Sequence, residues 1–398
     1  MKGKLTGTVV GLTLVVGGTA FTDAQINPYT DTGAKLEIIS QSIIEDAGEN
    51  RIEISKVEPA VTLKKWGGEV GMTVKYDKVK AEGKRPFLSN RVEWKGLKEE
   101  VHTYPLEAKE GMEDGGLELE VILNEKPVTN VFDFTIEGAE NLDFFYQPAL
   151  TQQEIDEGAV RPDNVIGSYA VYHKIKANHR IGSTNYATGK AFHIYRPKAI
   201  DANGIETWAE LSYLNGVLNV TVPQKFLDDA VYPVKVDPTL GYTSVGLSIS
   251  ANNNAETSNP STMGGSGTMT KIQVAVADAG ADSGVKMALY TDVAGVPTAL
   301  VANSSSGEVI VTRTTKPTQD SEWTSSTGVS ASLTAGSKYW LTHRKNGTSV
   351  NIYYDVGGQN ARYSTVTYAN FPTDPYVVAG SDGDTAFYSF YITYTCTT

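Results

Sequence analysis

The sequence predicts an all-β protein with tandem β-sandwich domains, the last of them a jelly-roll-like sandwich. Short segments of alternating apolar and polar residues recur along the chain, separated by clusters of Gly, Ser, Asn and Asp. No segment has the apolar spacing of a long amphipathic helix. Of the 398 residues, 40% are apolar and 20% are charged, which is the composition of a folded globular protein rather than a disordered one.

The first part of the chain contains the clearest strand patterns. In Gly116–Leu123 apolar and acidic residues alternate, so Leu117 and Leu119 should face a core while Glu118 and Glu120 face water. The segment Val131–Ile136 shows the same alternation. Further strands are predicted at Arg51–Ile54, Val61–Trp66, Val70–Tyr76 and Phe87–Trp94.

One hairpin and two short helices interrupt these strands. Asn215-Gly216 lies between two alternating segments, and this dipeptide favours the positive φ angles of a type I′ turn. Thr151–Glu157 should form a helix capped by its threonine. Pro223–Ala230 should form a second helix, with proline at its first position.

The last part of the chain has six to eight short strand-like segments, a number and spacing typical of a jelly roll or a related two-sheet fold. These segments are Lys271–Val276, Val285–Tyr290, Gly307–Thr312, Lys338–Thr342, Val350–Tyr354, Ala361–Val366 and Thr385–Thr395.

Charge density predicts the domain organisation. Residues 1–240 carry a net charge of −9 and residues 241–398 one of −3, which places a boundary near Asp237–Gly246. Residues 1–24 have a basic head, an apolar stretch and small residues, so they form either a secretory signal or an N-terminal strand. Residues 25–240 then form one or two β-sandwich domains, with a break near 110–116 or 147–163, and residues 241–398 form the jelly-roll-like domain.

Composition excludes several classes of function. The net charge of −12 and a pI near 5.0 disfavour nucleic acid as a partner, because phosphates would be repelled. No apolar run beyond the N-terminal stretch reaches the roughly 20 residues of a membrane-spanning helix. Cys396 is the single cysteine, which rules out an internal disulfide framework and a multi-cysteine zinc site.

The chain contains no recognised catalytic motif. Its five histidines lack the spacing of a helical zinc site, and Gly264–Thr268 lacks the last glycine of a nucleophile elbow. Acidic residues are numerous, but pairs such as Glu118 and Glu120 are interpreted as solvated strand faces rather than glycosidase carboxylates. Two Asp- and Gly-rich segments, Asp278–Ser283 and Asp382–Asp384, could supply oxygen ligands to a structural Ca²⁺, or could simply form turns.

Aromatic side chains are the remaining candidates for a binding site. Trp323, Trp340, Tyr353 and Tyr354 could form flat platforms for a sugar, or could belong to a core or a subunit interface. Trp340 lies in the alternating segment Tyr339–His343, so either Trp340 or Tyr339 should face the core.

Several motifs resemble those of known sequences. Ala230–Thr239 (AVYPVKVDPT) resembles a strand and turn that closes a β-domain in large secreted bacterial proteins. With Phe144–Pro148, Arg161–Asn164, Gly167–Lys174 and Gly189–Lys198, it resembles a family of uncharacterised β-rich proteins from phages and environmental bacteria, over roughly residues 50–245. Val285–Pro297 resembles jelly-roll modules of surface and phage proteins. The resemblance implies a structural role in a virion or at a cell surface, and no catalytic residues.

Residues and resemblance together predict a non-enzymatic structural or assembly protein. It would belong to a virion, as a decoration, head-fibre or tail-associated protein, or to a bacterial surface filament, and would form a homo-oligomer or larger assembly. The alternative is a secreted protein that binds carbohydrate, for instance a host cell-surface glycan. A polysaccharide-degrading enzyme is the least supported class.

Overall fold

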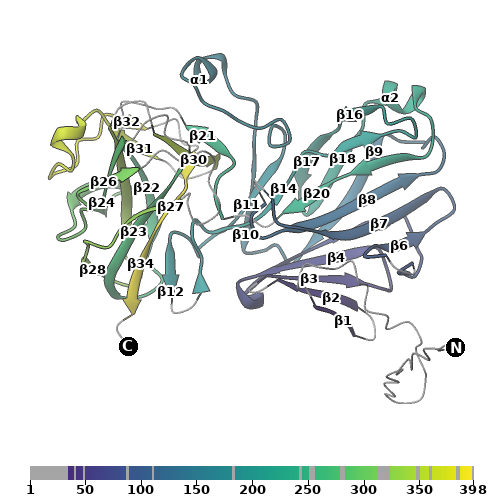
Figure 1. Cartoon of the computed structure of the whole chain (residues 1–398), viewed down its shortest axis with the longest axis horizontal. Coiled ribbons are helices and arrows are strands. Elements are labelled where there is room, and N and C mark those ends of the chain that lie inside the picture. Colours follow the sequence, from purple (N-terminus) through teal and green to yellow (C-terminus); the bar gives the residue numbers. More distant parts are fainter. Residues whose placement is uncertain are drawn as a thin grey trace, which may run out of the picture.

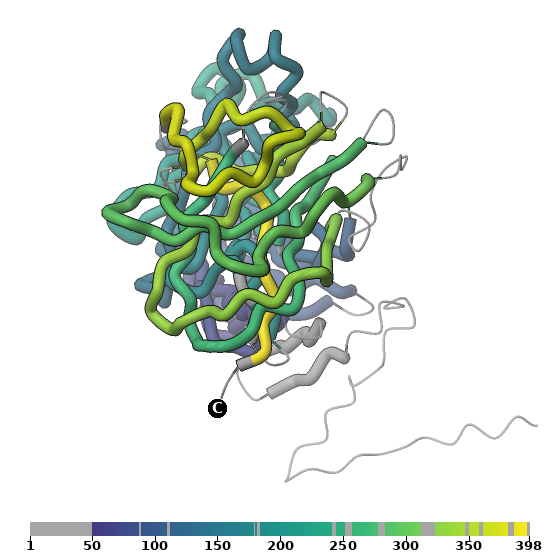
Figure 2. The backbone as a smooth tube through the Cα atoms, turned by 90° about the vertical axis from the view of Figure 1, so that its left-hand side faces the viewer, coloured from purple at the N-terminus to yellow at the C-terminus, as the bar shows by residue number. Residues whose placement is uncertain are grey.

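The computed structural model describes residues 35–39, 42–47, 50–86, 89–109, 112–181, 184–241, 244–250, 256–277, 283–311, 323–346, 350–357, 361–381 and 386–396. Within these residues the chain is almost entirely β, as predicted. Four sheets pair into two sandwiches that lie side by side (Figure 1). Figure 2 shows the second sandwich, in green to yellow, in front of the first.

The first sandwich consists of two large sheets. The first sheet has, in spatial order, β1 (Lys35–Ile39), β2 (Ser42–Ala47), β3 (Asn50–Ser55), β4 (Ala60–Lys65), β5 (Val70–Lys75), β9 (Val131–Glu137), β18 (Val217–Thr221) and β17 (Glu210–Leu214). The second sheet has β10 (Leu142–Tyr146), β11 (Tyr169–His173), β14 (Lys190–Ile194), β20 (Thr239–Gly241), β8 (Gly116–Leu123), β19 (Val234–Asp237), β15 (Lys198–Ile200) and β16 (Glu206–Trp208), and β7 (Glu99–Leu106) pairs with β8 and with β6 (Val92–Lys95).

The second sandwich also has two sheets. The third sheet has β13 (Thr184–Asn185), β12 (His179–Ile181), β34 (Phe390–Cys396), β23 (Gly267–Ala277), β30 (Asn351–Val356) and β21 (Ser248–Ser250), with β27 (Trp323–Ser326), β28 (Ser332–Leu333) and β33 (Ala386–Tyr388) paired to its members. The fourth sheet has β25 (Val296–Leu300), β24 (Ser283–Val293), β29 (Lys338–Lys345), β22 (Glu256–Thr262), β31 (Arg362–Ser364) and β32 (Gly380–Ser381), with β26 (Glu308–Val311) beside β24. From β22 to β24, and again from β29 to β31, successive strands alternate between the two sheets, as they do in a jelly roll.

Helices are short and peripheral among the described residues. They are α1 (Gln152–Asp156), α2 (Gln224–Asp229) and the 3-10 turns at Trp66–Gly68 and Tyr368–Asn370. Thr151 caps α1, as the sequence predicted, and the structure shows that it does so in a capping box with Glu154. None of the helices in the described part of the chain is long and apolar enough to cross a membrane.

Each sandwich has its own hydrophobic core. The alternation in β8 and β9 turns residues such as Leu119, Phe132 and Phe134 inward, into the same core as Phe192 of β14. In the second core Ile272, Leu289, Leu341 and Phe390 pack together. Complete burial of such a side chain stabilises the fold by roughly 1.5–3 kcal/mol, so these layers carry most of the folding free energy in a chain without disulfides.

Most predicted strands of the first part occur where the pattern placed them. β8 has the predicted bounds, and the Asn215-Gly216 turn has φ angles of 50° and 80°, as a type I′ hairpin requires. The segment predicted at Phe87–Trp94 is a strand only from Val92, and residues 87–88 lie outside the described residues.

Candidate functional site

The four aromatic candidates are divided between two sheets. Trp340 lies in β29 of the fourth sheet; it is only 1% exposed and donates a hydrogen bond from Nε1 to Asp292 (2.8 Å). Its neighbour Tyr339 faces the main core, so the alternation places Trp340 on the opposite face, packed against Phe371 and Tyr376. The indole ring of Trp340 is therefore almost completely covered, although Trp340 is one of the residues that line the cleft described below.

The other three candidates belong to the third sheet. Tyr354 of β30 faces the second core, and its hydroxyl accepts a hydrogen bond from Arg161. Tyr353 points to the outer face of the same strand and is half-buried. Trp323 of β27 is also half-buried, and its ring packs edge-on against Tyr391. Only Trp323 and Tyr353 could contribute aromatic surface to a ligand at this outer face.

The junction between the sandwiches contains a buried polar network. Lys190 of β14 and Asp355 of β30 form an ion pair with Nζ and Oδ2 2.6 Å apart, and both side chains are 0% exposed. The hydroxyl of Tyr172 donates to the same oxygen (2.8 Å), and the backbone N–H of Leu247 donates to Asp355 Oδ1 (2.9 Å). The two sandwiches thus share one desolvated ion pair.

Further contacts at the junction mimic strand pairing. The side-chain amide of Gln147, which is completely buried, donates to the carbonyl of Val356 and accepts from its N–H. The chain of the first part also contributes the hairpin of β12 and β13 to the third sheet, where β12 runs parallel to β34 (Figure 1). Tyr172 stacks on Phe387 with ring centroids 4.4 Å apart and the planes almost parallel.

A cleft of about 570 Å³ opens beside this junction. Its aromatic walls come from both sandwiches and include Phe145 and Phe387, and its polar rim includes Asp143, Lys174 and Lys338. This volume lies within the range of small-ligand sites, and domain interfaces are common places for such sites.

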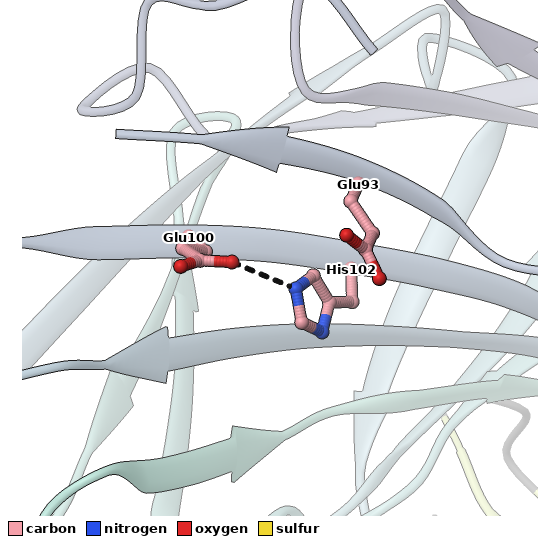
Figure 3. A group of neighbouring side chains, drawn as sticks. All are labelled: Glu93, Glu100 and His102. Carbon is pink, nitrogen blue, oxygen red and sulfur yellow. Dashed lines mark hydrogen bonds and ion pairs between the residues drawn. The ribbon is translucent and has the colours of Figure 1, made fainter. Parts of the chain in front are cut away.

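The outer face of the second sheet carries a second polar network. Glu93 of β6 and Glu100 and His102 of β7 point toward one another (Figure 3), with one ligand-type atom from each lying within 4.8 Å of the others. His102 Nε2 is 3.2 Å from Glu100 Oε2. One imidazole and two carboxylates are donors that zinc accepts.

Cations already neutralise these carboxylates. Lys95 Nζ is 3.0 Å from Glu93 and 3.7 Å from Glu100, and Arg91 forms a further ion pair with Glu93. Burial alone would raise the pKa of Glu93, but the hydrogen bonds from Lys95 and Arg91 outweigh it and lower that pKa. The ammonium group of Lys95 therefore contacts both carboxylates that a metal ion would need as ligands.

The network continues across β8 and β19 and corrects one sequence-based prediction. Glu118 and Glu120, which were expected to face water, are only 7% and 5% exposed. Lys235 forms ion pairs with Glu120 and Asp237, and Tyr104 donates to Glu120 (2.8 Å). The expected outward direction is correct, but neighbouring side chains on that face cover both glutamates.

The pKa of Glu118 is strongly raised. Burial is the main cause, and a hydrogen bond and the negative charge of Asp237 add to it, so Glu118 stays protonated when it faces Asp237. A pair of carboxyl groups that shares a proton can in principle perform acid–base chemistry. Here, however, Asp237 is neutralised by Lys235 at 2.8 Å.

Sequence reasoning missed the junction network and the outer-face network. Lys190 and Asp355 are far apart in sequence, and neither segment has a motif that pairs them. A weak signal existed: Lys190-Ala-Phe-His-Ile194 is an apolar strand with a lysine in it, and a lysine in a buried strand needs a partner. The candidate Ca²⁺ segments, Asp278–Ser283 and Asp382–Asp384, lie outside the described residues apart from Ser283.

A scan against protein-family models found no match for this chain, and a search of curated proteins found no similar sequence.

Proposed function

We propose that this protein is a non-enzymatic structural or assembly component of a virion (decoration, head fibre or tail-associated) or of a bacterial surface filament, with its second sandwich projecting from the assembly. The junction between the sandwiches carries the proposal. A buried ion pair, the Gln147 amide and a shared strand pairing all cross it. A projecting module needs a fixed direction, and these contacts supply one.

The proposal places the protein in a virion or at the cell surface, as a homo-oligomer or part of a larger assembly. Size-exclusion chromatography with light scattering on the full chain, followed by negative-stain microscopy, tests it. We expect a defined oligomer or filament in which the two sandwiches keep one relative orientation. Monomers in which the angle between the sandwiches varies freely would contradict it.

A variant pair sharpens this experiment. Gln147→Ala removes two hydrogen bonds to the backbone of β30, so we expect a broader distribution of angles between the sandwiches. Gln152→Ala is the matched control, because Gln152 is exposed on α1 and its amide donates to Asp156 of the same helix. Identical distributions for both variants would mean that the junction does not set the orientation.

The cleft favours one alternative, a secreted protein that binds carbohydrate. Its aromatic walls and charged rim suit a sugar, which presents both apolar faces and hydroxyl groups. A glycan array with wild type and with Lys174→Ala and Lys338→Ala tests this function. We expect binding to be weakened in both rim variants and unchanged in Lys225→Ala, whose lysine is exposed on α2. Glycan binding that none of these substitutions affects would argue against the cleft as the binding site.

A further inference from the structure

The ion pair between Lys190 and Asp355 is placed unusually for two charged groups. Neither side chain is exposed to solvent, and the pair joins β14 of the first sandwich to β30 of the second. Stacked aromatic rings of Tyr172 and Phe387 lie beside it. Burial of both charges carries a large desolvation penalty, which a neutral product would remove.

The contacts around the pair match what an amide-forming reaction needs. Lys190 Nζ lies 2.6 Å from Asp355 Oδ2, and Cγ is bonded to that oxygen. The ion pair therefore holds the nitrogen next to the carbon that it would attack. Lys190 Nζ also donates to the carbonyl of Val245 (3.1 Å), which orients the nitrogen. Asp355 Oδ1 receives the N–H of Leu247, which can stabilise negative charge on that oxygen during attack.

We propose that Lys190 and Asp355 condense to form an intramolecular isopeptide bond that links the two sandwiches covalently. One proton first passes from the ammonium to Asp355 Oδ2, which gives an amine and a carboxylic acid. The amine nitrogen attacks Cγ, the Nζ–Cγ bond forms and the Cγ–Oδ2 bond breaks. A second proton passes from Nζ to Oδ2, and this oxygen departs as water with both protons. The pair is neutral before and after, and no other reactant is consumed.

Tyr172 is the positioning residue for the departing oxygen. Its hydroxyl donates to Oδ2, and Tyr172 is the cross-strand neighbour of Lys190 in β11. Burial, followed by the negative charge of Asp355, raises the pKa of Tyr172 well above its ordinary value, so the phenol keeps its proton and can relay one to the leaving group. The other hydrogen bonds are retained in the product. The new amide N–H can still donate to the carbonyl of Val245, and Oδ1 can still accept from the N–H of Leu247.

Burial distinguishes this ion pair from another one with a similar distance between nitrogen and oxygen. Lys225 and Asp229 on α2 are 2.5 Å apart, but their side chains are 89% and 65% exposed. Water stabilises both charges there and opposes dehydration. The condensation is therefore expected at Lys190 and Asp355 and not at Lys225 and Asp229, although the two pairs contain the same groups.

Mass spectrometry of the full chain tests the proposal. We expect a mass lower than that of the corresponding linear chain by one water molecule. After trypsin digestion, peptides 181–198 and 346–362 should appear as one branched species, uncleaved after Lys190. Recovery of separate peptides 181–190 and 346–362 at their full masses would overturn the proposal, and this result requires no variant.

Three variants assign the mass loss to its residues. Lys190→Met and Asp355→Ala should each restore the full mass, and Tyr172→Phe should slow the loss without moving it to other residues. Lys225→Met is the control and should keep the loss. A loss of water that persists in Lys190→Met, or that maps to peptides containing Asp229, would also overturn the proposal.

Discussion

The junction and the outer face of the second sheet stabilise buried carboxylates in different ways. Each contains lysines and buried carboxylates on β-strands. At the junction one lysine meets one aspartate with no exposed surface, and both make further hydrogen bonds with backbone groups and with the Tyr172 hydroxyl. On the outer face, Glu93 and Glu120 are buried, but their cations Lys95 and Lys235 still reach solvent.

This difference decides what each network can do. On the outer face, water can solvate the partly exposed lysines when an ion pair is broken. Each of these ion pairs therefore contributes little to stability. Water cannot solvate the junction pair in this way, so the loss of one partner leaves the charge of the other buried and uncompensated. We therefore expect the same type of substitution to have very different effects in the two regions.

The largest effect is expected from Asp355→Ala. It leaves Lys190 without its counter-charge in a dry site, so we expect the free energy of unfolding to fall by about 3–5 kcal/mol, before any contribution from a covalent link. Urea denaturation of the full chain, followed by fluorescence, measures this. The double variant Lys190→Met with Asp355→Leu should recover much of the loss, because no unpaired charge remains. Equal losses in the single and double variants would contradict the argument.

Backbone packing at the junction gives the next effect. A Cβ at position 246 would overlap the backbone of Tyr354, whereas one at Gly71 in β5 would meet only ordinary contacts at 3.5 Å or more. Gly246→Ala should therefore lower the free energy of unfolding by about 1–3 kcal/mol, the usual range for overpacking, while Gly71→Ala should change it much less. Thermal unfolding of both variants measures this difference. Equal melting temperatures for the two variants would show that the backbone at the junction shifts to accommodate the added methyl group.

The outer face is best tested by pH. Glu118 has a pKa raised above its ordinary value of 4.5 by burial and Asp237, so the folded state holds a proton that the unfolded state releases. Its contribution to stability is fully present below about pH 4.5 and is lost as pH rises toward the folded pKa, with a slope of up to about 1.4 kcal/mol per pH unit.

Glu118→Gln should remove this slope and stabilise the fold at neutral pH. Urea denaturation of wild type and variant between pH 5 and 8 measures it. Parallel pH profiles would mean that Glu118 is ionised in the folded state.

Sequence patterns predicted local structure well and long-range polar pairing poorly. The bounds of β8 and the Asn215-Gly216 turn follow from residues next to one another, which an alternation or a dipeptide encodes directly. The alternation also assigned Glu118 and Glu120 to the correct face. It could not show that Tyr104, Lys235 and Asp237 cover that face, because these residues come from other strands.

The candidate sites show the same limit. Alternation left open whether Tyr339 or Trp340 faces the core, and the answer depended on packing by Phe371 and Tyr376. Lys190 and Asp355 meet only because two sandwiches dock, so no local pattern could pair them. The buried lysine in β14 indicated a partner without identifying it.

The smallest effect is expected at the cluster of Glu93, Glu100 and His102. Glu100→Gln removes one partner of Lys95 and His102 from a face where both lysine and glutamate contact water, so the free energy of unfolding should fall by less than about 1 kcal/mol. Lys95→Met is the more informative variant, because it removes the cation that lies between the two carboxylates. If Lys95 is what excludes a metal ion, zinc should raise the melting temperature of Lys95→Met and leave that of wild type unchanged, and Lys95→Met combined with His102→Ala should lose the response. A rise in the melting temperature of wild type with zinc would show instead that the exposed ammonium moves aside. The ion pairs of Lys95 would then not prevent this face from binding a metal ion.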